Sequence, residues 1–440
     1  GVARGILSLE QVDEVHTALQ AMLEREGVHV EQWYVCPHEK EENCGCRKPS
    51  PFFLQKAAEE YGLDLGSSFM IGDHPSDPKT ADTAGAFGLY VLTGHGMHHL
   101  HELPDSTPVF HNIAEAGEWM LEHPRPDTYF AEAVTEAARA VRNGGLAVFP
   151  TETVYGLGAN AYDPNAVARI FEAKKRPFHD PLIVHVSDPG QVPPMVDGLP
   201  EKALGLMDKF WPGPLTLVLP KSEKVPDVVT AGKRSVAVRM PSHPLAGRLI
   251  TEAGVPIAAP SANLFGRTSP TTAAHVRHQL ESSFDALIDG GTCRVGVEST
   301  VLSLTGETPE LLRAGGLSLE DIEAVIGPVR HQGRRETVGE AAEPGTVRET
   351  GAGPESERGP EKDPGASPGL LPDHYAPVTP LVVTDNVEMY RYSSSAGKLL
   401  FSGSGEGFSG PTLVLSESGD VREAAVKLYH AIQLLDTMEL

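Results

Sequence analysis

The sequence has few cysteines, no long apolar run and an excess of negative charge, and each of these limits what the 440-residue chain can be. Three of its four cysteines lie between Cys36 and Cys46, which argues against a disulfide framework and favours a metal site in a reducing cytoplasm. No apolar run approaches the roughly 20 residues needed to cross a bilayer, and no charged-then-apolar signal segment opens the chain. The net charge of −24 disfavours broad binding to nucleic acid, although clustered Lys and Arg leave room for a local basic groove.

Two common nucleotide-binding motifs are also absent. The sequence contains no Walker loop (GxxxxGK followed by Ser or Thr) and no GxGxxG that opens a helix. A nucleotide would therefore have to bind through a different sequence motif. The composition, with 40% hydrophobic and 22% charged residues, is typical of a globular protein with two or three domains.

Apolar patterning divides the chain into four segments. Residues 1–122 alternate helix and strand signals: a capping box at Ser8, strands in VHVEQWYVC and SFMIGD, and a helix in IAEAGEWMLEH, followed by a boundary at PRPDTY. Residues 129–330 interleave helices with strands such as LAVFP, LIVHV and LTLVL, which predicts an open α/β domain with a mixed, twisted sheet. Residues 333–367 lack Leu, Ile, Met and aromatics and are predicted to be a disordered linker. Residues 368–440, with LVV, KLLFSG, TLVLSE and a final amphipathic helix, predict a small α/β module.

The first segment contains a compact set of metal-binding residue types. Cys36, His38, Cys44 and Cys46 place three thiols and one imidazole within eleven residues. Four such ligands match a closed, tetrahedral, structural zinc site. A chance cluster of reduced cysteines is the alternative.

Shortly after this cluster, Lys48 precedes a strand that ends at Asp73, with Asp77 nearby. A cation beside paired carboxylates is suited to a phosphoryl group and Mg²⁺. Together with GVARG at the start, these residues resemble the haloacid dehalogenase (HAD)-type phosphatases of the zinc-containing heptose bisphosphate and histidinol phosphate branch. That family's DxD nucleophile and its Ser or Thr motif are expected upstream of Gly1. The resemblance therefore implies a fragment of a sugar-phosphate phosphatase, with a structural relic as the alternative.

The second segment carries five motifs in which hydroxyl, amide and cationic residues follow apolar runs. They are PTETVYGLG from Pro150, KKRPFHDPLIVHV from Lys174, WPGPLTLVL from Trp211, APSAN from Ala259 and GVEST from Gly296. Ligands usually bind at the strand ends of such sheets, and two cations at a helix end can hold a polyphosphate. Taken singly, each motif has a structural alternative: a Thr-rich strand end, a solvated basic helix end or a core histidine.

Taken together, these motifs resemble the YrdC-like threonylcarbamoyl-AMP synthase family in its two-domain form. The signature is Lys174-x-Arg176 with Ser261-x-Asn263, and the resemblance covers about residues 130–330, resuming at PGLLPDHYAP and in the C-terminal Rossmann-like module. It implies that L-threonine, bicarbonate and ATP, with Mg²⁺, give threonylcarbamoyl-adenylate and pyrophosphate. The product would serve a tRNA-modifying transferase complex that makes threonylcarbamoyladenosine. No acid–base triad is evident, and positioning chemistry of this kind requires none.

The resemblance also implies roles for individual residues, with Lys174 and Arg176 as the catalytic cations. Threonine is expected to contact Thr151, Thr153, His185, Arg239 and Ser299. ATP is expected to contact Lys174, Arg176, Asp180, Ser261, Asn263, Ser269, Arg313 and, from the linker side, Tyr375.

Two other functions compete with this interpretation. Domains of this fold carry a concave basic surface, so a non-enzymatic module with weak contact to double-stranded RNA is one alternative. The negative charge and the absence of basic patches interleaved with aromatics count against it. A carbamoyltransferase of hydrogenase maturation is the other, but the acylphosphatase-like and additional zinc-finger segments expected of it are missing.

Overall fold

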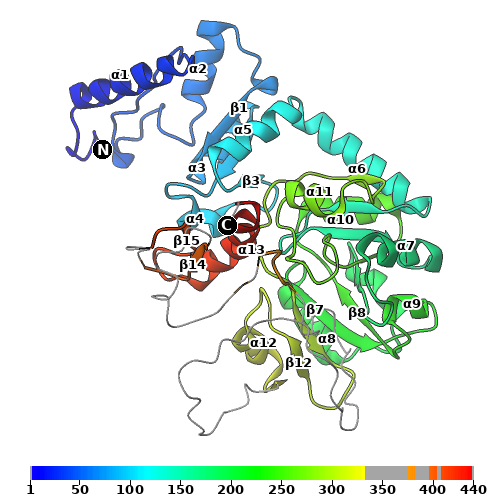
Figure 1. Ribbon diagram of the computed structural model, residues 1–440. Coiled ribbons are helices and arrows are strands. Elements are labelled where there is room, and N and C mark those ends of the chain that lie inside the picture. Colours follow the sequence, from blue (N-terminus) through cyan, green and yellow to red (C-terminus); the bar gives the residue numbers. More distant parts are fainter. Residues whose placement is uncertain (1, 332–374, 380, 382–395, 404–407, 439–440) are drawn as a thin grey trace, which may run out of the picture. The chain divides into compact units, whose positions relative to one another are not determined.

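The computed structural model describes residues 2–331, 375–379, 381, 396–403 and 408–438. The chain divides into two compact units, Gly1–Pro126 and Asp127–Leu440 (Figure 1). The predicted linker at 333–367 and most of the predicted strand LVV lie outside the described residues.

The smaller unit is built around three parallel strands. They pair in the order β1 (Phe69–Gly72), β2 (Phe87–Val91) and β3 (Val109–Phe110). Trp119 is buried, and its ring packs against the rings of Phe87 and Phe110 at centroid distances of 6.0 and 5.6 Å. The helical segments of this unit are α1 (Leu9–Arg25), η1 (Lys40–Glu42), α2 (Phe52–Tyr61), η2 (Leu65–Ser67), α3 (Ser76–Ala84), α4 (Gly96–His99), η3 (Leu100–Glu102) and α5 (Ile113–Glu122).

Two sequence predictions for this unit have different outcomes. The capping box is confirmed, because the Gln11 N–H donates to Ser8 Oγ at 3.1 Å and the Ser8 N–H donates to Gln11 Oε1 at 2.8 Å. The strand predicted in VHVEQWYVC is wrong, since residues 28–39 form neither helix nor strand. A strand needs a hydrogen-bonded neighbour, and no described strand pairs with this segment.

The larger unit contains a mixed sheet, as predicted. Its described strands form a ten-stranded sheet in the order β10-β4-β5-β9-β6-β8-β7-β11-β12-β13. The sheet contains parallel pairs such as β6–β8 and antiparallel pairs such as β5–β9. The strands are β4 (Ala147–Phe149), β5 (Gly156–Asn160), β6 (Ile183–His185), β7 (Leu215–Pro220), β8 (Ser235–Arg239), β9 (Ile257–Ala259), β10 (Ala286–Leu287), β11 (Thr300–Ser303), β12 (Glu310–Arg313) and β13 (Arg330–His331).

Helices cover this sheet, as the interleaved helix and strand patterns predicted. Helix α6 begins at Pro126, inside the boundary predicted at PRPDTY, because proline is tolerated in the first turn of a helix. No helix in the described part of the chain is long and apolar enough to span a bilayer. The helical segments are α6 (Pro126–Arg142), α7 (Pro164–Lys174), η4 (Pro189–Gln191), η5 (Pro193–Met195), α8 (Glu201–Phe210), α9 (Asp227–Thr230), α10 (Pro244–Ala253), α11 (Ala273–Leu280) and α12 (Leu319–Ile326).

Alternate residues of one strand belong to separate cores. Val148 of β4 lies in a large apolar cluster with Phe171 of α7 and Leu206 of α8. Its neighbours Ala147 and Phe149 lie in a second cluster, which includes residues of α6 and α10. This follows from the two-residue period of a strand, and it fixes the register that brings the strand ends together.

The described C-terminal residues form a small α/β module. Strands β14 (Lys398–Leu400) and β15 (Thr412–Val414) pair in parallel, and helix α13 spans Val421–Thr437. Two buried residues of α13, Tyr429 and Ile432, share an apolar cluster with Val154 of the motif PTETVYGLG. The module therefore packs directly against the segment that carries the candidate site.

Candidate functional site

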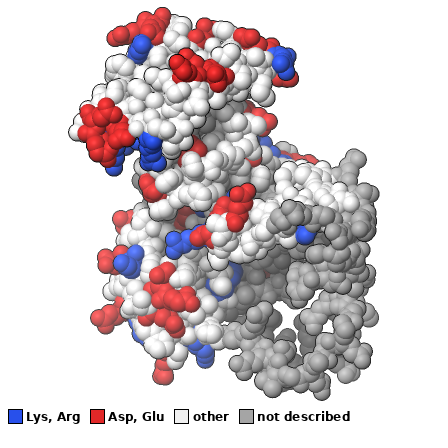
Figure 2. All heavy atoms as spheres, turned by 90° about the vertical axis from the view of Figure 1, so that its left-hand side faces the viewer, with Lys and Arg blue, Asp and Glu red and all other residues white. Residues whose placement is uncertain are grey.

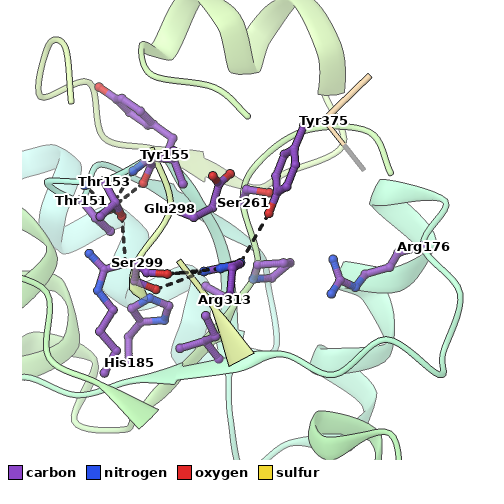
Figure 3. Close-up of a pocket in the computed structure, with 16 residues that line it drawn as sticks. Thr151, Thr153, Tyr155, Arg176, His185, Ser261, Glu298, Ser299, Arg313 and Tyr375 are labelled. Carbon is purple, nitrogen blue, oxygen red and sulfur yellow. Dashed lines mark hydrogen bonds between the residues drawn. The ribbon is translucent and has the colours of Figure 1, made fainter. Parts of the chain in front are cut away.

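A single pocket of the larger unit is lined from all but one of the five sequence motifs (Figure 3). The polar groups lie just beyond or at strand ends: Ser261 follows β9, Ser299 precedes β11, and Arg239 ends β8. The order of the sheet brings these ends together although they are far apart in the sequence. The lining residues are Thr151, Thr153, Val154, Tyr155, Gly156, Arg176, Ile183, His185, Arg239, Ala259, Pro260, Ser261, Glu298, Ser299, Arg313 and Tyr375.

One end of the pocket combines buried hydroxyls with an arginine. Thr151 Oγ1 accepts the Val154 N–H and lies 2.8 Å from Thr153 Oγ1. Arg239 donates from Nη1 to Thr153 Oγ1 at 2.8 Å, and its Nη2 forms an ion pair with Glu152 at 2.7 Å. These residues are at least nine-tenths buried, so their hydrogen bonds are sheltered from water. This end is a fixed set of donors suited to a small carboxylate with a hydroxyl group.

His185 lies beside this cluster, at the end of β6. Its side chain is 4% exposed, and its ring meets Phe149 edge-on at 5.9 Å. Burial, with a further contribution from nearby Arg239, lowers the pKa of His185 from 6.5 to about 3. Its Nδ1 has no hydrogen-bond partner among the described residues. The imidazole is therefore neutral at physiological pH and can offer a hydrogen bond to a bound ligand.

The low pKa of His185 predicts a pH dependence of stability. Between about pH 3 and 6.5, His185 binds a proton in the unfolded chain but stays neutral in the folded protein. The free energy of unfolding should therefore fall as the pH is lowered through this range. The contribution is about 1.4 kcal/mol per pH unit at most. Urea unfolding at several pH values should show a flatter dependence for His185→Gln than for the unsubstituted protein. Parallel curves would contradict the prediction, and His331→Gln, at an exposed position, is the matched control.

The other end of the pocket carries two further arginines. Arg176 follows α7, is 6% exposed and forms an ion pair with Asp180 at 2.8 Å. Arg313 donates from Nη2 to the Ser299 carbonyl at 2.9 Å and to Ser299 Oγ at 3.2 Å. Its Nη1 reaches the hydroxyl of Tyr375 at 3.5 Å. Two cations held by neighbouring groups suit a polyphosphate at this end.

Lys174 is buried behind the pocket wall. Its ammonium donates to the carbonyl oxygens of Ser261 and Asn263, and to Asn263 Oδ1 at 3.3 Å. Burial, together with nearby Arg176, lowers the pKa of Lys174 well below its usual value. The hydrogen bonds of Lys174 therefore hold residues 261–263 in place from the side facing away from the pocket.

The sequence-predicted residues thus fall into two groups. Those on the pocket wall are Thr151, Thr153, Arg176, His185, Arg239, Ser261, Ser299, Arg313 and Tyr375. The others each contact a wall residue from behind: Lys174 and Asn263 bond to Ser261, Asp180 to Arg176, and Ser269 to Glu298.

Two carboxylates near the pocket were missed by the sequence reasoning. Glu152 pairs with Arg239, and Glu298 lines the pocket between Ser261 and the Thr151–Thr153 pair (Figure 3). Both lie inside motifs that were recognised, PTETV and GVEST. Glu152 stands between Thr151 and Thr153, and Glu298 directly precedes Ser299. This adjacency to hydroxyl residues was the signal that could have identified both carboxylates.

In the smaller unit, the four predicted metal ligands come together. The ligand atoms of Cys36, His38, Cys44 and Cys46 all lie within 4.8 Å of one another. The sulfur–sulfur distances are 3.6 Å for Cys36–Cys44, 3.4 Å for Cys46–Cys36 and 3.7 Å for Cys46–Cys44. A tetrahedral zinc ion with Zn–S bonds of about 2.3 Å would hold its sulfurs roughly 3.8 Å apart, so the donor set fits zinc.

A second pocket, which lies in the smaller unit, contains the residues predicted to bind phosphate and magnesium. Lys48, Asp73 and Asp77 all line it. Lys48 Nζ pairs with Asp77 Oδ1 at 2.5 Å, and Asp73 Oδ2 accepts the His95 N–H at 2.9 Å. A Cβ atom on Gly72 would lie 2.0 Å from Asp77 Oδ2, so glycine is needed where the carboxylate crosses the end of β1. The pair of carboxylates and the ammonium group are therefore held together at one strand end.

Comparison with protein families matches three parts of the chain. Residues 139–315 match the family model described as telomere recombination, which covers Sua5, YciO and YrdC. Residues 317–440 match the C-terminal domain of threonylcarbamoyl-AMP synthase. Residues 45–116 match a HAD-hydrolase-like model, which supports a HAD-like domain in the smaller unit.

Individual relatives extend the similarity beyond the single domains. The threonylcarbamoyl-AMP synthase of Pyrococcus abyssi is 43% identical over 310 residues, covering 68% of this chain and 84% of the relative. That of Bacillus subtilis is 47% identical over 253 residues, covering 57% of this chain and 66% of the relative. The crystal structure of P. abyssi Sua5 complexed with L-threonine aligns with a TM-score of 0.55 and 38% identity, covering 69% of this chain and 86% of that one.

Proposed function

Since the chain belongs to the threonylcarbamoyl-AMP synthase family and is an enzyme of this type, we propose that the pocket of its larger unit is the site of adenylate formation. The observation that supports this most strongly is that one pocket is lined by three arginines together with three hydroxyl residues: Arg176, Arg239, Arg313, Thr153, Ser261 and Ser299. Such a site joins a small polar substrate to a polyphosphate.

The reaction combines L-threonine, bicarbonate and ATP into threonylcarbamoyl-AMP, pyrophosphate and water. After the threonine amine has been carboxylated, a carbamate oxygen attacks the α-phosphorus of ATP, and the bond to the bridging oxygen of the β-phosphate breaks. The departing pyrophosphate carries negative charge. Fixed cations next to it lower the barrier, and no acid–base triad is required.

The amino-acid substrate binds at the hydroxyl end of the pocket. Glu152 and Thr153 fix the orientation of the Arg239 guanidinium. The guanidinium is therefore positioned to bind the threonine carboxylate. Neutral His185 and the Ser299 hydroxyl complete this end. The P. abyssi relative solved with L-threonine supports the assignment of this substrate.

The nucleotide binds at the end with Arg176 and Arg313. Both guanidiniums line the pocket, and so does Tyr375, which follows the predicted linker in the sequence. Lys174, Asn263, Asp180 and Ser269 act here through the wall residues that they contact. A magnesium ion bound with the triphosphate would neutralise part of its charge.

Measuring pyrophosphate release from ATP tests this function. Release should depend on both L-threonine and bicarbonate and should be abolished when either is omitted. Pyrophosphate release that does not depend on L-threonine would contradict the proposal. The same assay separates the enzyme from an RNA-binding module, which would give no turnover.

The charge on one face of the molecule gives no support to an RNA-binding module. On the face shown in Figure 2, acidic side chains form separate groups with Lys and Arg between them, and the described residues there form no continuous basic surface. Binding to the phosphate backbone of double-stranded RNA requires clustered cations. On the similarity to threonylcarbamoyl-AMP synthases, we assign threonylcarbamoyl-adenylate as the product and a tRNA-modifying transferase complex as the partner that consumes it.

In the smaller unit we assign a structural zinc ion to Cys36, His38, Cys44 and Cys46. The support is the donor set itself, because three sulfurs and a His38 Nδ1 lie at mutual distances that a tetrahedral ion requires. Zinc would cross-link a segment that has neither helix nor strand over residues 28–39. Thiols that bind zinc must stay reduced, which favours a cytoplasmic location.

The HAD-like domain is assigned to phosphate chemistry of the sugar-phosphate phosphatase class. Lys48, Asp73 and Asp77 meet in one pocket, as a phosphoryl group and a magnesium ion would require. A phosphate titration followed by NMR tests this assignment, with shifts expected for the backbone amides of His74 and His95. The zinc-containing heptose bisphosphate or histidinol phosphate branch is the specific assignment within that class.

A further inference from the structure

The loop that carries Ser299 rests directly on helix α13. Gly296 has φ +73°, and a Cβ atom there would lie 2.5 Å from Val426 Cα and 2.6 Å from the Ala425 carbonyl oxygen. A side chain at this position would therefore push α13 away. The next residue, Val297, packs into the apolar cluster formed by Val154, Tyr429 and Ile432.

The following residue, Glu298, is held by two hydroxyl donors. Its Oε2 accepts the Tyr429 hydroxyl at 2.8 Å, and its Oε1 accepts the Ser269 hydroxyl at 2.5 Å. A carboxylate oxygen has two lone pairs, so each oxygen keeps the capacity to bind a second partner. Glu298 also lines the pocket, where its carboxylate is seen between the Thr151–Thr153 pair and Tyr375 (Figure 3).

The charge of the pocket wall makes this carboxylate unusual. The described lining residues include three arginines and, among their side chains, one carboxylate, that of Glu298. Arg239 already pairs with Glu152, and Arg176 with Asp180. A carboxylate that faces anionic substrates is tolerated when a cationic group lies between them.

We propose that Glu298 binds a cationic group of the substrates, and that Tyr429 of α13 is the positioning residue for its carboxylate. This inference rests on the proposed function of the pocket. The cationic group is either the α-ammonium of L-threonine or the divalent cation that accompanies ATP, and both offer the same chemistry to a carboxylate. Burial, with a further contribution from Glu298, raises the pKa of Tyr429, so its hydroxyl remains a donor throughout the neutral range.

A double-mutant cycle on pyrophosphate release tests the pair. Glu298→Gln should lower kcat/KM about 100-fold and Tyr429→Phe about 10-fold, as expected for hydrogen bonds to a charged group. If Tyr429 acts through Glu298, Tyr429→Phe should change the rate less than about twofold in the Glu298→Gln background. Lys427→Gln, which removes an ion pair to Glu423 on the same helix, is the matched control and should keep full activity.

The KM values distinguish the two cations. Glu298→Gln should raise either the KM for L-threonine or the Mg²⁺ concentration needed for half-maximal rate, and the one that rises identifies the cation. Unchanged values of both, an unchanged kcat/KM in Glu298→Gln, or equal effects of Tyr429→Phe in both backgrounds would each overturn the inference. An unsubstituted enzyme without threonine-dependent release would instead overturn the function proposed for the pocket.

Discussion

Replacing Arg176 by Met should reduce threonine-dependent pyrophosphate release by about 10²–10³-fold. Arg176 is buried in the pocket wall, where a fixed charge aimed at a departing pyrophosphate has its largest effect. The loss should appear in kcat, because the cation stabilises charge that develops in the transition state. Steady-state kinetics with saturating threonine and ATP measure it.

Two variants separate this effect from misfolding. Burial raises the pKa of Asp180, so this carboxyl can take up a proton when Arg176 is removed. The double variant Arg176→Met with Asp180→Asn should therefore unfold at nearly the same denaturant concentration as the unsubstituted protein and remain inactive. Arg169 lies in α7, and Arg169→Met breaks a half-exposed ion pair with Asp285. This variant should keep full activity. Retained activity in Arg176→Met would contradict the assignment of the nucleotide end.

Replacing Cys44 by Ser should remove the bound metal from the smaller unit. The protein is expected to contain about one zinc per chain, and Cys44→Ser should contain close to none. Because structural zinc contributes on the order of 10 kcal/mol to folding in small domains, residues 36–46 should also become susceptible to proteolysis. Elemental analysis of the purified protein, with limited proteolysis, measures both effects.

The fourth cysteine provides the control. Cys293 is 1% exposed and lies in the larger unit, outside the Cys36–Cys46 cluster. Cys293→Ser should therefore keep the full zinc content, even if it lowers the stability of the larger unit. A zinc-free protein with an ordered segment over residues 36–46 would show that the four ligand atoms are held together without a metal.

Much of the larger unit could be predicted from the sequence because its signals are local and agree with one another. Runs such as LTLVL and LIVHV are strands bounded by turn residues, and the structure forms β7 and β6 there. The polar groups of the pocket follow from the same pattern, since Ser261 and Arg239 stand where apolar strands end. That these ends belong to one site was implied only by the family resemblance of the motifs taken together.

The contacts behind the pocket wall could not be predicted. Lys174 was expected to face ATP, but whether its ammonium points into the pocket or onto the Ser261 carbonyl depends on the backbone path of a segment about 90 residues away. The carboxylates of Glu152 and Glu298 depend in the same way on partners from β8 and α13. Such choices are decided by tertiary contacts and leave no periodic signal.

The missing strand at VHVEQWYVC has a related cause. Its alternation of apolar and polar residues is compatible with a strand, but a strand forms only beside a hydrogen-bonded neighbour. The described residues place no such neighbour next to residues 28–39. The local sequence pattern can therefore show that a segment is compatible with a strand, whereas the formation of the strand depends on the rest of the sheet.

We propose that the pocket joins a carboxylated threonine to the α-phosphate of ATP. Incubation with ¹³C-bicarbonate, L-threonine and ATP, followed by mass spectrometry of the products, identifies the bonds that form. We expect a threonylcarbamoyl-AMP ion that is one mass unit heavier than the unlabelled compound, together with pyrophosphate. A threonyl-AMP ion without the label, or AMP and pyrophosphate formed without any adduct of threonine, would contradict the account.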